Sequence, residues 1–206
     1  MPAPSLIRVE NLTGADLQPI LPDLARLRTT VFRAWPYLYD GETDDEQKHL
    51  VRYAASPNAI IVVARDGDRA VGMSTALPMT AEGPAVREPF EARGWDAARF
   101  FYFGESVLLP EYRGRGIGVE FFHQREAHAR RAGTADYACF CAIQRPADHP
   151  ARPADYVPLD AFWRHRGYHF YPDLVCRMRW KEVGQPAQTE HTLAFWLKPL
   201  REAALP

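Results

Sequence analysis

The stretch RFFYFGESVLLPEYRGRGIGVEFFHQREAHARR, from Arg99 to Arg131, carries the strongest structural signal in this sequence. Its first part, Phe100 to Leu109, is rich in aromatic and branched residues and predicts a strand that is covered on both faces. Pro110 ends that strand, because proline has no amide hydrogen to donate to a ladder. An amphipathic helix is expected after RGRGIG, residues 113–118, and Gly133 suits its end.

The loop between this strand and helix carries the clearest chemical signal. Gly114, Gly116 and Gly118 let the backbone approach a ligand closely, and the first amides of a helix lack intrahelical partners. With the helix dipole they form an anion site, most naturally for phosphate, and Arg113 and Arg115 strengthen that interpretation. The glycine spacing differs from the G-x-G-x-x-G of dinucleotide-binding folds, and the lysine of a P-loop is missing.

The strand, the proline and the pattern R-x-x-G-x-G together resemble the acetyl-CoA loop of the GNAT superfamily of N-acetyltransferases. Arg113, Gly116 and Gly118 match the family pattern of Arg or Gln, two residues, Gly, one residue, then Gly or Ala. A glycine-rich turn that merely joins a strand to a helix is the alternative. The resemblance implies that acetyl-CoA is the cofactor and that its pyrophosphate lies on Arg113, Gly114, Arg115, Gly116, Ile117 and Gly118.

Length and composition fit one globular domain, expected over residues 1–206. Hydrophobic residues make up 47% of the chain and charged residues 25%, and the net charge is -1. Such a charge provides no overall attraction for nucleic acid, so phosphate binding has to be local.

Cysteine content and hydropathy predict a cytoplasmic protein. Three cysteines are too few for a disulfide framework, and Cys139 and Cys141 alternate with apolar neighbours, so we expect buried thiols in a reducing compartment. We find no signal-peptide pattern and no run long enough to cross a membrane. The spacing of His and Cys matches no zinc motif, so no metal is expected.

Hydrophobic periodicity predicts the remaining elements. Two stretches, 81–98 and 144–158, are expected to be insertions or loops near the active site, the second stiffened by four prolines. Strands are expected at 6–12, 59–65, 70–79, 137–143, 168–180 and 191–197, and helices at 17–32, 44–55 and 159–166.

That order of elements also resembles the GNAT order. The resemblance implies a mixed α/β (α+β) fold with a central, mostly antiparallel twisted sheet. About six to seven strands with a V-shaped splay and about four flanking helices are expected.

Direct transfer of an acetyl group to an amine needs orientation, a base, an oxyanion donor and an acid. The resemblance implies that the pantetheine arm pairs with the backbone of Val107, Leu108 and Leu109. Glu105 is the candidate base, because it is the one ionisable side chain in an apolar strand and desolvation would raise its pKa. The alternative is that an arginine pairs with Glu105, which then only braces the loop.

The acid is harder to place. Family members often carry a tyrosine four residues before the Gly-aromatic pair that ends the late helix, and this chain has Trp163 there. Trp163 cannot donate a proton in that role and is counted among the cofactor-binding residues. Tyr168 is the candidate catalytic acid and Tyr156 an alternative, although a buried tyrosine is more often a core residue. Solvent could also protonate the thiolate.

Acceptor recognition is expected where charge and rigid rings combine. Arginines can grip a carboxylate in bidentate fashion, which fits a small amine that bears such a group. A structural lid whose charges face water is the alternative. The candidate substrate-binding residues are Arg33, Tyr37, Tyr39, Arg145 and Tyr156.

The sequence therefore predicts an N-acetyltransferase that moves the acetyl group of acetyl-CoA to a primary amine of a small molecule. A catalytically inactive acyl-CoA-binding regulatory module is the alternative, motivated by Trp163. No nucleic acid and no membrane partner is expected. The apolar run FWLKPL, 195–200, would suit a homodimer interface, but an ordinary buried edge explains it equally well.

Overall fold

The computed structural model describes residues 6–202 and 204–206. They form two compact units. The first contains residues up to Val31, Glu42–Leu77 and Phe103–Gly133. The second contains Phe32–Gly41, Pro78–Tyr102 and the residues from Thr134 onward. The expectation of a single domain stays a prediction, and each unit is described by itself.

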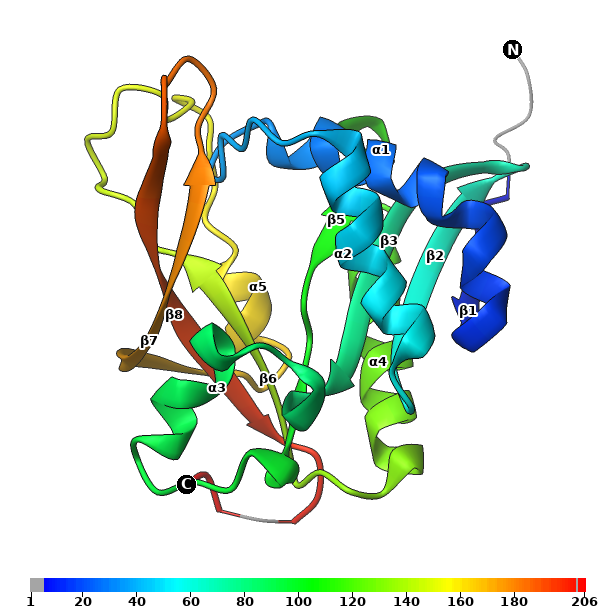
Figure 1. The fold of residues 1–206 in the computed structure, drawn as a ribbon, viewed down its shortest axis with the longest axis vertical. Helices are drawn as coiled ribbons and strands as arrows, with labels where there is room; N and C mark the ends of the chain where they lie inside the picture. Colours follow the sequence, from blue (N-terminus) through cyan, green and yellow to red (C-terminus); the bar gives the residue numbers. More distant parts are fainter. Residues whose placement is uncertain (1–5, 203) are drawn as a thin grey trace. The chain divides into compact units, whose positions relative to one another are not determined.

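The first unit holds four strands joined in antiparallel ladders. β1 pairs with β2, β2 with β3, and β3 with β5. Figure 1 shows α1 and α2, in blue and cyan, crossing in front of β2 and β3. The elements are β1 (Arg8–Leu12), η1 (Gly14–Ile20), α1 (Leu21–Phe32), α2 (Thr43–Ala55), β2 (Ile60–Asp66), β3 (Arg69–Pro78), β5 (Ser106–Leu108), η4 (Pro110–Tyr112) and α4 (Ile117–Ala132).

Strand β3 presents its two faces to two different helices. The Thr75 hydroxyl donates to the hydroxyl of Tyr53 on α2 at 3.1 Å. A Cβ at Gly72, three residues earlier, would lie 3.2 Å from the ring of Phe121 on α4. Positions three apart on a strand point to opposite faces, so α2 and α4 cover opposite faces of this sheet. The sheet is thereby buried on both sides, as the apolar run in β2 predicts.

The second unit is built on the long β7–β8 hairpin, which Figure 1 shows in orange and red. β6 pairs antiparallel with β8 and parallel with β4. The elements are η2 (Met79–Ala81), α3 (Pro84–Glu91), η3 (Ala97–Arg99), β4 (Phe100–Tyr102), β6 (Tyr137–Ile143), α5 (Asp160–Arg164), β7 (His169–Lys181) and β8 (Gln188–Pro199).

Neighbouring residues of β8 show how this second sheet is covered. Phe195 meets Phe90 of α3, with ring centroids 4.8 Å apart. Trp196 meets Trp163 of α5, with ring centroids 5.1 Å apart. Because successive side chains of a strand point to opposite faces, α3 and α5 cover opposite faces. Both contacts bury aromatic rings, which contribute strongly to core stability.

The mixed, mostly antiparallel fold is confirmed. Among the described residues, each unit contains four strands. The expectation of one strand from Phe100 to Leu109 is wrong. The run is divided into β4 and β5, and residues 103–105 between them belong to neither strand. This division raises the strand count above the expected six to seven. The cysteines of β6, Cys139 and Cys141, are buried free thiols, as expected.

Candidate active site

The glycine loop that precedes α4 has a backbone that only glycine adopts easily. Gly114 has φ 75° and Gly116 has φ 82°, both in the left-handed region. A Cβ at either position would meet no atom within 4 Å, so lack of space is not what selects glycine here. The backbone conformation itself requires it, because an L side chain with this φ is strained by about 1–2 kcal/mol.

The same turn leaves a row of backbone donors open. Among the described residues, no carbonyl or side chain accepts from the amides of residues 114–118. The first intrahelical acceptor is the Gly116 carbonyl, which takes hydrogen bonds from Val119 and Glu120. Unpaired amides at a helix start carry partial positive charge, so the loop fits an anion such as a diphosphate. These residues therefore fit the pyrophosphate of acetyl-CoA.

Side chains hold the loop in this shape. The Tyr112 hydroxyl donates to Asp66 Oδ2 at 2.7 Å, which ties η4 to the end of β2. Arg115 donates to the Glu111 carbonyl at 2.8 Å and lies over the ring of Tyr112. Arg113 donates from Nε to the Leu108 carbonyl at 3.3 Å. The two arginines thus remain at the loop, where they add positive charge beside the open amides.

Strand β5 has one backbone edge that does not face β3. The Leu109 amide donates to the Val71 carbonyl and the Thr75 amide to the Glu105 carbonyl, so residues 105, 107 and 109 direct their backbone groups toward β3. Ser106 and Leu108 therefore direct theirs away from β3. Of the three residues expected to pair with pantetheine, Leu108 presents its backbone groups on that edge, while Val107 and Leu109 face β3. Ser106 was not among the expected residues.

The division between β4 and β5 arises from a bulge opposite Thr75. The Gly104 amide donates to the Thr75 carbonyl at 3.1 Å, and the Thr75 amide donates to the Glu105 carbonyl at 3.0 Å. Two residues thus face one residue of β3, and the Thr75 hydroxyl accepts from the Glu105 amide at 3.2 Å. A bulge redirects side chains at the end of a strand. Here it sets the direction of the Glu105 carboxylate.

Gly104 and Arg125 fix this bulge. A Cβ at Gly104 would lie 2.4 Å from the Tyr53 hydroxyl and 2.7 Å from Thr75 Oγ1, so only glycine fits. Arg125 of α4 is 1% exposed, and its Nη1 donates to the carbonyls of Thr75 and Glu105 at 3.4 and 3.3 Å. Its guanidinium also lies over the ring of Phe103. A buried cation therefore anchors the turn that carries Glu105.

Glu105 is buried in an ion-pair network. Arg28 of α1 contacts it through Nη1 and donates from Nε to Glu46 of α2. The Nε2 atom of His49, on α2, lies 3.6 Å from Glu105 Oε2. Arg28 thus bridges two carboxylates, and Glu105 lies between a guanidinium and an imidazole.

The pKa expected for Glu105 is wrong in direction. Burial does oppose its ionisation, but Arg28 and then His49 outweigh that effect and hold the pKa of the carboxyl well below its usual range. Burial likewise opposes the charge of Arg28, yet Glu105 and Glu46 raise its pKa above the ordinary value. Glu105 is therefore a firmly ionised carboxylate, as in the alternative of an arginine-paired brace.

Trp163 and Tyr168 lie together in the aromatic core of the second unit. The Trp163 ring is 5.1 Å from the Phe140 ring, and the Tyr168 amide donates to the Trp163 carbonyl at 3.2 Å. Tyr168 is 2% exposed and packs 5.0 Å from Phe140. It lines a hollow of about 520 Å³ with Arg164, His169 and Phe170. The roles expected for Trp163 and Tyr168 stay predictions.

The arginines that were expected to bind the acceptor form ion pairs with carboxylates of the second unit. Arg33 pairs with Asp40 at 2.6 Å. Arg145 donates to the carbonyls of Pro36 and Tyr37 at 2.8 and 3.1 Å, and pairs with Glu182 at 2.5 Å. A guanidinium used in this way is less available to an acceptor carboxylate.

Aromatic residues surround these pairs. The Tyr156 ring meets Trp35 edge-on at 5.8 Å, and Tyr37 packs 4.8 Å from Phe32. Tyr39 forms a β-bridge with Glu182. The expected acceptor residues thus belong to one neighbourhood within this unit, and their binding role stays a prediction.

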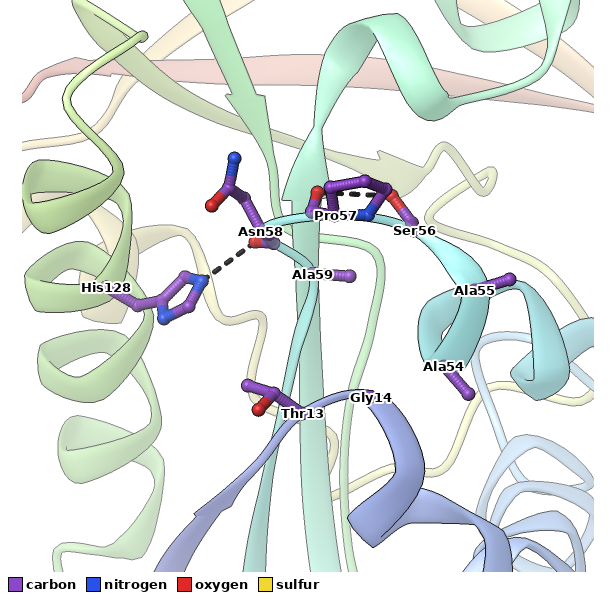
Figure 2. A pocket seen from close by; sticks show the side chains of 9 residues that line it. All are labelled: Thr13, Gly14, Ala54, Ala55, Ser56, Pro57, Asn58, Ala59 and His128. Atoms are coloured by element: carbon purple, nitrogen blue, oxygen red, sulfur yellow. Dashed lines mark hydrogen bonds between the residues drawn. The ribbon is translucent and has the colours of Figure 1, made fainter.

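A second hollow, of about 420 Å³, lies in the first unit, where Figure 2 shows His128 pointing to the loop after α2. The His128 Nε2 lies 2.8 Å from the Asn58 carbonyl oxygen, and burial lowers the pKa of this histidine. None of the expected site residues lines this hollow. Within residues 6–202 and 204–206, no cluster of His, Cys, Asp or Glu could hold a metal, and no helix is long and apolar enough to span a membrane.

Sequence reasoning missed the residues that surround Glu105. Arg28 and His49 are separated from it by 77 and 56 positions, and their helices look like ordinary amphipathic surface helices in sequence. Arg125 lies in a run of charges that predicts a solvated face, although it is buried. Their positions follow from tertiary contacts, for which the sequence carries no local signal.

A family model matches most of the chain. The model of the acetyltransferase (GNAT) family matches residues 24–154. No curated protein matches the chain in sequence.

Solved structures share the fold at low sequence identity. A ribosomal-protein-alanine N-acetyltransferase from Brucella melitensis is 15% identical with a TM-score of 0.60, over 93% of this chain and 99% of that one. A GNAT-family acetyltransferase from Staphylococcus aureus Mu50 is 10% identical with a TM-score of 0.59, over 95% of this chain and 100% of that one. The PaiA N-acetyltransferase from Thermoplasma acidophilum, solved with coenzyme A, is 11% identical with a TM-score of 0.55, over 94% and 99%.

The match of the family model covers 131 of the 206 residues, more than half of the chain. It includes the glycine loop, β5 and the Arg28–Glu105 pair. The chain therefore belongs to the GNAT acetyltransferase family and is an acetyl-CoA-dependent acyltransferase.

Proposed function

We propose that this protein transfers the acetyl group of acetyl-CoA directly to a primary amine of a small molecule. The row of open amides at residues 114–118 is the observation that supports binding of acetyl-CoA, the acetyl donor. They would hold the pyrophosphate, with Arg113 and Arg115 beside them. The outward backbone groups of Ser106 and Leu108 would pair with the pantetheine arm.

The reaction then proceeds by attack of the unprotonated amine on the thioester carbonyl carbon. The C–N bond forms and the C–S bond breaks, so that the thiolate of coenzyme A leaves. The thiolate takes up a proton from Tyr168 or from solvent, and the proton that the amine nitrogen loses replaces it through solvent. The protein contributes mainly by orienting the two reactants, which is worth several powers of ten in rate.

The observed contacts define the acceptor amine less closely than the acetyl donor. Arg33 and Arg145 are paired with Asp40 and Glu182, so the proposal does not require a carboxylate on the acceptor. Rings from residues 33–40 and 144–158 of the second unit, including Tyr37, Tyr39 and Tyr156, would supply flat apolar contacts to a small amine. Residues 81–98 of the same unit form an insertion that contains the helix α3.

Thiol release from acetyl-CoA, measured across a panel of small primary amines with coenzyme A binding measured in parallel, tests this function. We expect saturable release with at least one amine. Binding without turnover on any amine would contradict the proposal and favour an inactive acyl-CoA-binding module. Absence of binding would contradict both.

A further inference from the structure

His49 stands beside Glu105 where the protein meets solvent. It follows Glu46 by one helical turn on α2, and its Nε2 lies 3.6 Å from Glu105 Oε2. The His49 side chain is 31% exposed, whereas those of Glu105 and Arg28 are 8% and 9% exposed. Of the two side chains that pair with the Glu105 carboxylate, His49 is therefore the one that a ligand can reach.

The buried carboxylate sets the protonation pattern of this imidazole. An ionised carboxylate only accepts hydrogen bonds, so the nearby Nε2 of His49 keeps its hydrogen when the ring is neutral. Arg52 Nη2 approaches the same nitrogen at 3.4 Å and would favour the other tautomer. Leaving the desolvated Glu105 carboxylate without a donor costs more free energy than leaving the less buried Arg52 without an acceptor. The tautomer with the hydrogen on Nε2 is therefore favoured.

In this tautomer, the Nδ1 atom of His49 carries the lone pair. Within the described part of the chain, Nδ1 has no hydrogen-bond partner. The charged and titratable groups that face the ring are Arg52 and Tyr53 of its own helix and Glu105 of the bulge, with Arg28 of α1 behind the carboxylate. The geometry is that of a base oriented by a buried carboxylate.

The location of His49 and Glu105 also suits a catalytic base. This inference rests on the acetyl transfer proposed above. Glu105 immediately precedes β5, at the end of that strand remote from the glycine loop. A pantetheine arm that starts at residues 114–118 and follows Leu108 and then Ser106 would bring its thioester end toward the bulge. Along a strand each residue advances about 3.3 Å, so the arm passes one residue after another in that order.

We propose that His49 is the general base of the reaction and that Glu105 is its positioning residue. Nδ1 of neutral His49 takes one proton from the ammonium of the acceptor, which leaves a neutral amine and an imidazolium. The amine attacks the thioester carbon, and the second proton that its nitrogen loses ends on the departing thiolate. The imidazolium then returns its proton to water, so the reaction releases one proton overall.

Two amines of similar size separate this role from a structural one. Ethylamine is protonated at neutral pH and needs a base, whereas 2,2,2-trifluoroethylamine is largely neutral and does not. We expect His49→Gln to lower kcat/KM for ethylamine about 100-fold and for trifluoroethylamine less than tenfold, with unchanged coenzyme A affinity. The rising limb of the pH profile for ethylamine should lose one ionisation. His128→Gln, a histidine change elsewhere in the same unit, should leave both rates unchanged.

Equal losses with both amines, or no loss, would overturn the assignment. If the wild-type chain acetylates neither amine but binds coenzyme A, these two amines are not acceptors of the enzyme, and the tautomer of His49 becomes the deciding measurement. Nitrogen-15 NMR of labelled histidine should then show His49 protonated at Nε2 in the wild type. A ring protonated at Nδ1 would contradict the proposal, and Glu105→Gln should change the tautomer if Glu105 positions it.

Discussion

At the scale of single residues, the charge on Glu105 is decided by its partners rather than by its burial. A carboxyl in an apolar segment suggests a raised pKa, but Arg28 and His49 reverse that direction. Removing one member of a buried ion pair leaves the other charge desolvated, which typically costs 3–5 kcal/mol. We expect Glu105→Gln to lower the free energy of unfolding by about 3 kcal/mol. Urea denaturation checks this, with exposed Glu111→Gln as the control. A loss below about 0.5 kcal/mol would contradict the pairing.

The same pair predicts a pH dependence of stability. Because the pKa of Glu105 is lower in the folded than in the unfolded chain, the unfolded state binds more protons as the pH falls below the ordinary value of 4.5. The stabilisation is therefore complete above that value and is lost progressively below it. The difference in unfolding free energy between wild type and Glu105→Gln should shrink from pH 6 toward pH 3. A difference that stays constant over this range would argue against a depressed pKa.

At the scale of elements, the bulge between β4 and β5 is where the apolar run departs from a regular strand. Gly104 permits it, since a Cβ there would collide with Tyr53 and Thr75. We expect Gly104→Ala to destabilise the protein by about 1–3 kcal/mol through overpacking and to lower acetyl transfer as the bulge shifts. Gly83→Ala, where a Cβ would meet nothing within 4 Å at an ordinary φ, is the matched control. Thermal unfolding and thiol release measure both effects, and equal behaviour of the two variants would contradict a tight bulge.

At the scale of the whole molecule, the sequence predicts element types and the glycine loop better than it predicts the side-chain contacts between distant residues. Local signals such as Pro110, the alternating glycines and Gly133 lie within a few residues of what they determine, so the loop and α4 follow from them. The bulge depends on Thr75, and the environment of Glu105 depends on Arg28 and His49, all distant in sequence. The internal pairing of Arg145 with Glu182 likewise depends on a strand hairpin whose contacts the sequence does not specify.

Binding of coenzyme A should also stabilise the folded chain as a whole. A ligand at 100 times its Kd adds about 2.7 kcal/mol if it binds only the folded state. For a chain of about 200 residues this corresponds to an increase in Tm of about 5–10 °C. Differential scanning fluorimetry with acetyl-CoA measures it, with pantetheine as the ligand that lacks the diphosphate. Equal shifts with both ligands would contradict a dominant role for the glycine loop.

We propose that the open amides of residues 114–118 hold the diphosphate, and isothermal titration with coenzyme A measures this binding. Gly116→Ala and Gly133→Ala both force alanine into a left-handed backbone, at φ 82° and 75°, and each should cost about 1–2 kcal/mol of stability. We expect Gly116→Ala to weaken coenzyme A binding at least tenfold and Gly133→Ala, at the far end of α4, to leave the Kd unchanged. Wild-type affinity in Gly116→Ala, or no detectable heat with the unmodified chain, would contradict binding of the diphosphate by these amides.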